Sequence, residues 1–157
     1  MDDRSLPFAG VELGGTKCVC TLAHSPDSIV QQETIPTTSP EETLGAIERL
    51  LSSWTAQGFA ALGINSFGPV DLDPASATWG FITRTTKLGW SGTDVAGRLA
   101  RAAGTPVAFD TDVNGAALAE MRWGAGRDFQ DFAYITVGTR VGVGLVVNGE
   151  PTRGLAH

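Results

Sequence analysis

The sequence predicts an α/β fold that opens with an antiparallel meander of three strands. Before residue 38, three strand-like segments follow one another with only short turns between them. After residue 38, segments of helical periodicity alternate with short apolar segments, and strands separated by helices indicate a sheet covered by helices. A chain of 157 residues with 42% hydrophobic residues can bury a core of this kind in roughly one domain.

The meander is expected from residues 8–13, 17–23 and 29–35. The first segment is apolar and ends at a glycine pair, and the second resumes with β-forming residues, so Gly14-Gly15-Thr16 predicts a tight hairpin turn. The third segment alternates as a strand would. These three segments therefore predict neighbouring antiparallel strands.

A strong start signal for a helix follows the meander. Ser39 is a preferred N-cap residue, Pro40 suits the first helical position, and Glu42 completes a capping box. Apolar residues then repeat at helical spacing, so one face of this helix is expected to pack on the core; they are Leu44, Ile47, Leu50, Leu51 and Trp54.

The rest of the chain continues the alternation. The apolar run at residues 60–65 is typical of a buried parallel strand, and Gly68-Pro69 ends it. We then expect an edge strand over residues 78–83, a helix over 94–103, a strand over 107–110, a helix over 114–123, and strands over 132–137 and 143–147. The last two strands do not fit the first sheet and have no helix left to cover them, so we expect the chain to be the front portion of a longer protein.

An opening meander followed by β-α units is typical of the ribonuclease-H-like half of an actin-like ATPase fold. We therefore expect the first lobe of that fold plus the start of its second lobe. The predicted boundary places residues 1–112 in a ribonuclease-H-like lobe. Residues 113–157 then supply an interdomain helix and the first strands of a truncated second lobe.

Composition excludes several classes of protein and of site. The net charge of −6 and pI near 4.7 argue against a nucleic-acid partner. No apolar run is long enough to span a membrane, and the first four residues lack the layout of a signal peptide, so we expect a cytoplasmic protein without a membrane partner. Cys18 and Cys20 form a lone C-x-C pair, which is a poor zinc site, and are expected to be buried free thiols.

The first segment with chemical potential is the hairpin turn. Backbone amides at Gly14 and Gly15 can approach a phosphate closely, Thr16 adds a hydroxyl, and Lys17 adds a cation. Glu12 is a candidate magnesium ligand, directly or through water. The alternative is a plain Gly-Gly hairpin beside exposed charges.

The second segment lies where the strand over residues 107–110 gives way to a helix. An Asp at such a junction sits beyond the carboxyl end of a strand, where open α/β sheets bind ligands, and can take a proton from a hydroxyl. The alternative is an Asp or Asn that caps the helix. Asp110, Asp112 and Asn114 also imitate a calcium loop, but Met121 stands where that loop needs its bidentate Glu.

The third segment, residues 138–144, is rich in glycine and joins two predicted strands. It does not match the dinucleotide-binding pattern, yet its amides can cradle a phosphate. The alternative is a glycine-rich hairpin with bulges. Two glycine-rich hairpins and one strand-end Asp together predict a phosphoryl-transfer cleft between two lobes.

With these segments the sequence resembles the ROK sugar kinases (repressor, open reading frame, kinase), and among them the bacterial fructokinase-like members. The resemblance covers nearly all of the chain. The matching segments are residues 12–17, residues 63–70, residues 83–90 with their Thr-Lys-Leu-Gly-Trp end, residues 112–120 and residues 134–149.

The resemblance implies a role for each matched residue. Asp112 is the general base. The phosphates of ATP are bound by Gly14, Gly15, Thr16, Lys17, Gly138 and Thr139. The sugar is bound by Gly68, Pro69, Lys87, Trp90, Thr111 and Asn114.

Three departures from the family pattern are evident. Arg140 stands where the family usually has Gly, so its side chain either contacts a phosphate or crowds the amides. Thr111 stands where many glucokinases have Asn, which puts glucose recognition in doubt. Members of the family also continue past the position of His157 into a sugar motif, a zinc-binding Cys/His region and the adenosine pocket, so the implied zinc ligands are not in this chain.

The reaction implied is ATP- and Mg²⁺-dependent phosphorylation of a hexose hydroxyl, with D-fructose as the first choice of sugar. By itself, the 157-residue chain is expected to be inactive. A non-catalytic sugar-binding or sensor module, related to the repressors of the family, is the alternative, and another actin-like ATPase is a weaker one. The expected partners are a hexose and ATP, and the resemblance also implies a homodimer.

Overall fold

The computed structural model describes residues 5–138 and 141–153. Within this part of the chain, no helix is long and apolar enough to cross a membrane. The elements, in chain order, are β1 (Phe8–Leu13), β2 (Lys17–Ser25), β3 (Ser28–Pro36), α1 (Pro40–Thr55), β4 (Leu62–Ser66), β5 (Phe81–Ile82), β6 (Thr93–Asp94), α2 (Ala96–Ala103), β7 (Val107–Thr111), α3 (Asp112–Trp123), β8 (Phe132–Val137), β9 (Val141–Val147) and β10 (Glu150–Pro151).

A five-stranded mixed sheet forms the main layer, in the order β3-β2-β1-β4-β7. The predicted meander is confirmed, because β1, β2 and β3 pair antiparallel. β4 and β7 then add in parallel beside β1. As a result the carboxyl ends of β1, β4 and β7 meet at one edge of the sheet.

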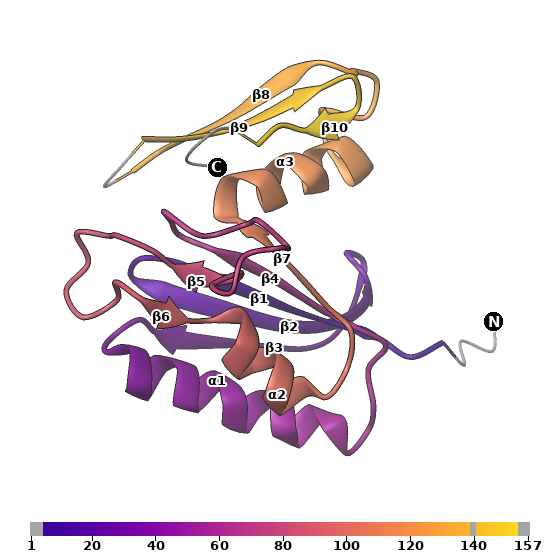
Figure 1. The fold of residues 1–157 in the computed structure, drawn as a ribbon. Helices are drawn as coiled ribbons and strands as arrows, with labels where there is room; N and C mark the ends of the chain where they lie inside the picture. Colours follow the sequence, from indigo (N-terminus) through magenta and orange to yellow (C-terminus); the bar gives the residue numbers. More distant parts are fainter. Residues whose placement is uncertain (1–4, 139–140, 154–157) are drawn as a thin grey trace.

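Helices α1 and α2 cover one face of this sheet (Figure 1). The predicted N-cap is confirmed: the Ser39 hydroxyl accepts a hydrogen bond from the Glu42 amide at 3.3 Å. The core lies between these helices and the sheet, and it includes Leu44, Ile47, Leu51 and Trp54 of α1. Cys18 and Cys20 are buried there as free thiols, as predicted, and burial raises the pKa of Cys20 to about 12.

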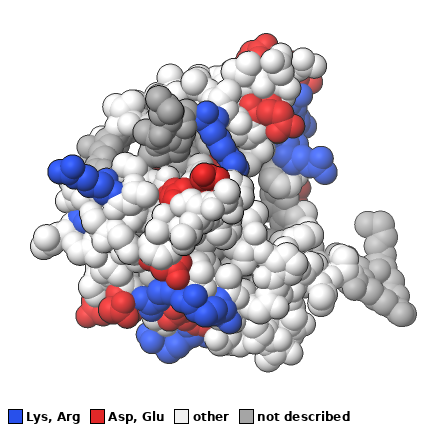
Figure 2. Space-filling view, viewed as in Figure 1, with Lys and Arg blue, Asp and Glu red and all other residues white. Residues whose placement is uncertain are grey.

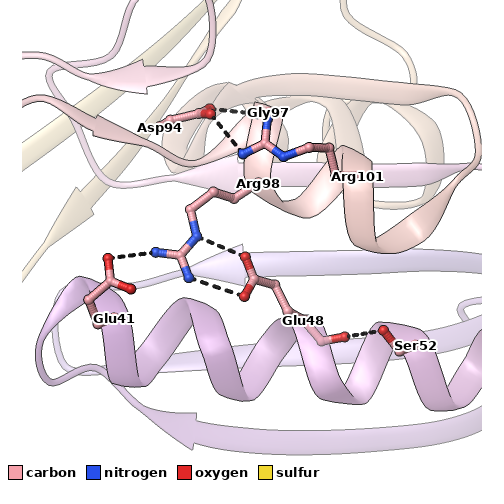
Figure 3. A network of polar contacts seen from close by, with 7 residues as sticks. All are labelled: Glu41, Glu48, Ser52, Asp94, Gly97, Arg98 and Arg101. Carbon is pink, nitrogen blue, oxygen red and sulfur yellow. Dashed lines mark hydrogen bonds and ion pairs between the residues drawn. The ribbon is translucent and has the colours of Figure 1, made fainter.

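Charged side chains join α1 to α2 on the outer surface. Arg98 of α2 lies between Glu41 and Glu48 of α1 and binds both (Figure 3). Figure 2 shows basic and acidic side chains side by side over this part of the molecule. The two helices are thus held to each other as well as to the sheet.

Helix α3 lies on the other side of the five-stranded sheet, between it and a separate three-stranded sheet of order β10-β9-β8 (Figure 1). Two glycines of β9 allow this close packing. A Cβ on Gly142 would come 2.7 Å from Cγ1 of Val113, and a Cβ on Gly144 would come 2.8 Å from the Val113 carbonyl carbon. The expectation that the last predicted strands begin a second sheet is confirmed.

The main difference from the expected elements is in residues 67–95, the excursion between β4 and α2. The predicted strand over residues 78–83 is only Phe81–Ile82, which pairs with Thr93–Asp94. The predicted helix over residues 94–103 begins later, at Ala96. Asp94 stays outside the helix, and its carboxylate accepts a hydrogen bond from the Gly97 amide in the first turn at 2.7 Å. The helix expected to begin at residue 114 begins at Asp112.

Candidate active site

The glycine turn between β1 and β2 is tightly held. The Gly14 amide donates to the Lys17 carbonyl at 3.1 Å, and the Thr37 hydroxyl donates to the Gly14 carbonyl at 2.8 Å. A Cβ on Gly14 would clash with the Lys17 carbonyl, whereas Gly15 faces open space. The tip of the turn, Gly15 and Thr16, is therefore fixed in place and exposed.

The excursion contributes a second wall. The Pro69 carbonyl accepts hydrogen bonds from the amide of Thr83 at 2.8 Å and from its hydroxyl at 3.2 Å, which fixes the turn after β4. Farther along the excursion, the Lys87 ammonium donates to the Gly15 carbonyl at 2.7 Å. The excursion therefore reaches across to the glycine turn.

The junction between β7 and α3 presents a carboxylate. Thr111 is the N-cap of α3, because its buried hydroxyl accepts a hydrogen bond from the Asn114 amide at 3.1 Å. Asp112 occupies the first turn of the helix, where the helix dipole stabilises the ionised carboxylate. The alternative, in which an Asp or Asn caps this helix, is therefore wrong, because Thr111 is the N-cap.

Asp110 stabilises the same junction through hydrogen bonds. One of its carboxylate oxygens accepts from the Asn114 side-chain amide and from the Thr111 amide, both at 2.8 Å. Arg153 lies 3.7 Å from the other oxygen. Among the described residues, no group of three or more His, Cys, Asp or Glu side chains lies close enough together to hold a metal ion.

The third glycine-rich segment belongs to the three-stranded sheet, which lies across α3 from the five-stranded sheet (Figure 1). β8 and β9 form an antiparallel pair, with Gly138 directly after β8 in open space. Thr136 and Gly142 pair in the register of this hairpin, and both line the cleft together with Val113 of α3. Thr139 and Arg140, which the sequence places in the phosphate motif, lie outside the described residues.

These segments surround a cleft with a volume of about 680 Å³. It brings together eight of the predicted site residues: Gly15, Thr16, Gly68, Pro69, Lys87, Thr111, Asp112 and Gly138. The other lining residues are Phe67, Val113, Thr136, Val141, Gly142 and Val143. A carboxylate therefore shares one cleft with two glycine-rich turns.

The remaining described residues of the predicted site lie outside this lining; they are Glu12, Gly14, Lys17, Trp90 and Asn114. Trp90 is fully buried and its indole N–H donates to the Thr38 carbonyl at 2.9 Å. Its ring packs edge-on against Phe67, with 5.3 Å between ring centroids. Trp90 therefore supports the cleft wall from behind, and the buried Asn114 holds the start of α3.

Glu12 fits the requirements of a water-mediated magnesium ligand. In the sheet register it lies beside Asn65 of β4, which lies beside Asp110 of β7, so three polar side chains form a row on the α3 face near the carboxyl ends of the strands. Mg²⁺ keeps several waters and binds through one or two carboxylates together with substrate phosphates. The exposed Glu12 carboxylate is suited to hold such an ion beside the glycine turn.

Sequence reasoning missed the apolar walls of the cleft, Phe67, Val113, Val141 and Val143. An apolar residue on a cleft wall has the same sequence signature as one in a core, so no local signal could identify these. The contact between Lys87 and Gly15 was also missed, because 72 positions separate the two residues.

The arrangement suits chemistry on a phosphorylated ligand. Exposed backbone amides at glycine turns bind phosphate oxygens, and a carboxylate at the start of a helix can accept a proton from a hydroxyl.

The model of the ROK family matches residues 8–157. The chain belongs to the ROK family. A fructokinase from Zymomonas mobilis subsp. mobilis is 47% identical to this ROK chain over 154 residues, which cover 96% of the chain and 51% of that protein.

Solved structures of ROK proteins share the fold. A ROK family glucokinase from Streptomyces griseus, in complex with glucose and AMPPNP, matches with a TM-score of 0.79 and 27% identity over 94% of this chain and 46% of that one. A ROK family transcriptional regulator, a homolog of the E. coli MLC protein, matches with a TM-score of 0.79 over 98% of this chain and 40% of that one, but at 19% identity this likeness concerns the fold alone.

These likenesses confirm the predicted α/β fold of the actin-like ATPases, with its first lobe and the start of the second. The ROK chain spans about half the length of the relative and of the structures that it matches.

Proposed function

We propose that the protein carrying this ROK chain transfers the γ-phosphoryl group of ATP to a hexose hydroxyl, with Asp112 as the general base. The observation that carries the proposal is the Asp112 carboxylate in a cleft that the glycine turn at Gly15 and Thr16 and the end of β8 at Gly138 also line. A phosphoryl transfer needs an anion cradle and a group that orients the acceptor, and this cleft offers both.

Each part of the cleft has a task in this reaction. Asp112 accepts a hydrogen bond from the acceptor hydroxyl, orients it, and takes its proton as it attacks; general-base catalysis of this kind contributes about 10²–10⁴ in rate. The amides at the tip of the first glycine turn and at the end of β8 bind phosphate oxygens. Magnesium, held through Glu12 and water, neutralises phosphate charge when bound.

We propose D-fructose as the substrate and fructose 6-phosphate as the product. The support is the higher identity to a fructokinase, 47%, than to the glucokinase of known structure, 27%. Thr111 also favours fructose over glucose as the substrate. It stands where many glucokinases have Asn, and its own buried hydroxyl caps α3. Mannose and glucose are the next substrates to test.

Asp112→Asn is expected to remove fructose-dependent ADP release, because the amide keeps the shape of the side chain but cannot accept the proton. A loss of about 10²–10⁴ in kcat is expected, with fructose affinity and thermal stability unchanged. The matched control is Asp27→Asn, an exposed aspartate in the β2–β3 turn, which should leave kcat unchanged. Near-normal turnover of the Asp112 variant would remove the general base from the proposal.

The same measurements distinguish a kinase from a sugar sensor of this family. A sensor would bind fructose in a calorimeter without Mg-ATP and would release no ADP with any hexose. A kinase releases ADP in proportion to the sugar phosphate formed.

A further inference from the structure

We propose that Lys87 binds the phosphoryl group that is transferred, and not the sugar as the family resemblance implies. This inference rests on the proposed function and assigns one residue within it. The Lys87 ammonium donates to the Gly15 carbonyl at 2.7 Å, and Gly15 is the exposed tip of the glycine turn. The cation therefore stands on the phosphate side of the cleft, although its backbone belongs to the excursion.

The backbone of Lys87 is well anchored for such a task. Its carbonyl accepts a hydrogen bond from the Trp90 amide at 3.2 Å, and its amide donates to the Thr85 hydroxyl at 3.3 Å. Trp90 is fully buried and is tied to the Thr38 carbonyl by its indole N–H. A cation on a fixed turn loses little conformational freedom when it binds an anion, which favours binding of a phosphoryl group.

The charge around Lys87 also favours an anion. Among the residues that the structure describes, no carboxylate forms an ion pair with it, and the Gly15 carbonyl is the acceptor of its ammonium. An ammonium has three N–H donors, so two remain for a ligand in the cleft.

The reaction itself favours a cation at this place. A phosphoryl group that approaches the acceptor hydroxyl must come near the Asp112 carboxylate, which repels it. Lys87 lines the same cleft as Asp112 and offsets this repulsion with a positive charge. Lysine is well suited to this, since it binds phosphate as a compact point charge.

Chemical labelling tests the contact directly, because Lys17 and Lys87 are the two lysines of the sequence. The native protein is acetylated with a trace of an amine-reactive ester, with and without magnesium tripolyphosphate, and the label on each peptide is measured by mass spectrometry. The amine of the N-terminus serves as the reference. Tripolyphosphate at ten times its Kd should slow labelling of Lys87 about tenfold. Unchanged labelling of Lys87, at a tripolyphosphate concentration that inhibits ADP release, would overturn the proposal.

Kinetics of variants separate a phosphoryl ligand from a sugar ligand. Lys87→Met should lower kcat by about 10²–10³ with the KM for fructose unchanged, and Lys87→Arg should recover part of the rate because it keeps the charge. Arg84→Met is the matched control, since Arg84 is an exposed cation of the same excursion. A raised KM for fructose with unchanged kcat in Lys87→Met would assign the residue to the sugar and overturn the proposal.

The two proposals fail in different ways. If the native protein releases no ADP with any hexose, the kinase proposal fails, and protection of Lys87 by tripolyphosphate still supports the phosphoryl site. If Asp112→Asn abolishes turnover while Lys87→Met does not change it, the kinase proposal stands and the assignment of Lys87 is wrong.

Discussion

At the scale of single residues, a glycine of β9 packs against the helix that carries the candidate base. Gly144 of β9 lets the strand rest on the backbone of α3 next to Val113, one residue after Asp112. A methyl group at Gly144 would meet the Val113 carbonyl carbon at 2.8 Å and Cβ of Ala117 at 3.3 Å. Because both neighbours belong to a helix, neither can move without moving Asp112.

Gly144→Ala is therefore expected to lower the free energy of unfolding by about 1–3 kcal/mol, the usual cost of overpacking. Urea denaturation measures this. Gly63→Ala in β4 is the matched control, because a Cβ there meets nothing within 4 Å, and it should change stability by no more than about 0.5 kcal/mol. Equal stability of the two variants would mean that the contact between β9 and α3 is looser than described.

Residue-level reasoning from the sequence succeeded where the signal was local. The glycine turn at Gly15 and the strand-to-helix junction at Asp112 follow from turn chemistry and from the end of a predicted strand, and both line the cleft. Trp90 was expected to contact the sugar, but the structure places it behind Phe67, because burial of one aromatic ring behind another depends on the tertiary fold.

At the scale of elements, one arginine links α2 to α1 beside their shared apolar core. Nε and Nη2 of Arg98 bind the two carboxylate oxygens of Glu48 at 2.8 and 3.1 Å, and Nη1 binds Glu41 at 2.9 Å (Figure 3). The side chain of Glu41 is 84% exposed, whereas that of Glu48 is 29% exposed. The bidentate pair with Glu48 should therefore stabilise the helix pair more than the pair with Glu41 does.

Arg98→Lys should lower the free energy of unfolding by about 1 kcal/mol, because lysine cannot make the bidentate contact. Glu41→Gln serves as the comparison and should cost no more than about 0.5 kcal/mol. Both values come from urea denaturation. A larger loss in Glu41→Gln than in Arg98→Lys would contradict this ranking.

Elements with strong local signals, such as α1, were predicted well. The short strand β5 was not, because it depends on pairing with a segment farther along the chain. Ser39 and Pro40 mark the start of α1 in the sequence, and the structure begins the helix at Pro40. The strand expected over residues 78–83 was mostly wrong, since the short pair Phe81–Ile82 and Thr93–Asp94 depends on how the excursion folds back.

At the scale of the whole molecule, the three-stranded sheet has an apolar face that points away from α3. In the register of β8 and β9, Ile135 pairs with Val143 and Val137 pairs with Val141. These side chains are 48–79% exposed, with Val143 the least and Val137 the most exposed. A contiguous apolar patch of this kind favours association.

The chain of residues 1–157 on its own is therefore expected to self-associate, as light scattering during size-exclusion chromatography would show. The double variant Ile135→Lys and Val143→Glu places opposite charges on a cross-strand pair of this face and should shift the chain toward the monomer. A monomeric unaltered chain would contradict the expectation.

We propose that the cleft holds a sugar hydroxyl against Asp112 and the phosphates of ATP against the glycine turn. The most direct test is a crystal structure of the native protein with fructose and a non-hydrolysable ATP analogue. We predict that one fructose hydroxyl lies about 2.6–3.2 Å from the Asp112 carboxylate, with phosphate oxygens at the Gly15 and Thr16 amides. A sugar bound out of hydrogen-bond reach of Asp112, or a nucleotide whose phosphates lie away from that turn, would contradict this proposal.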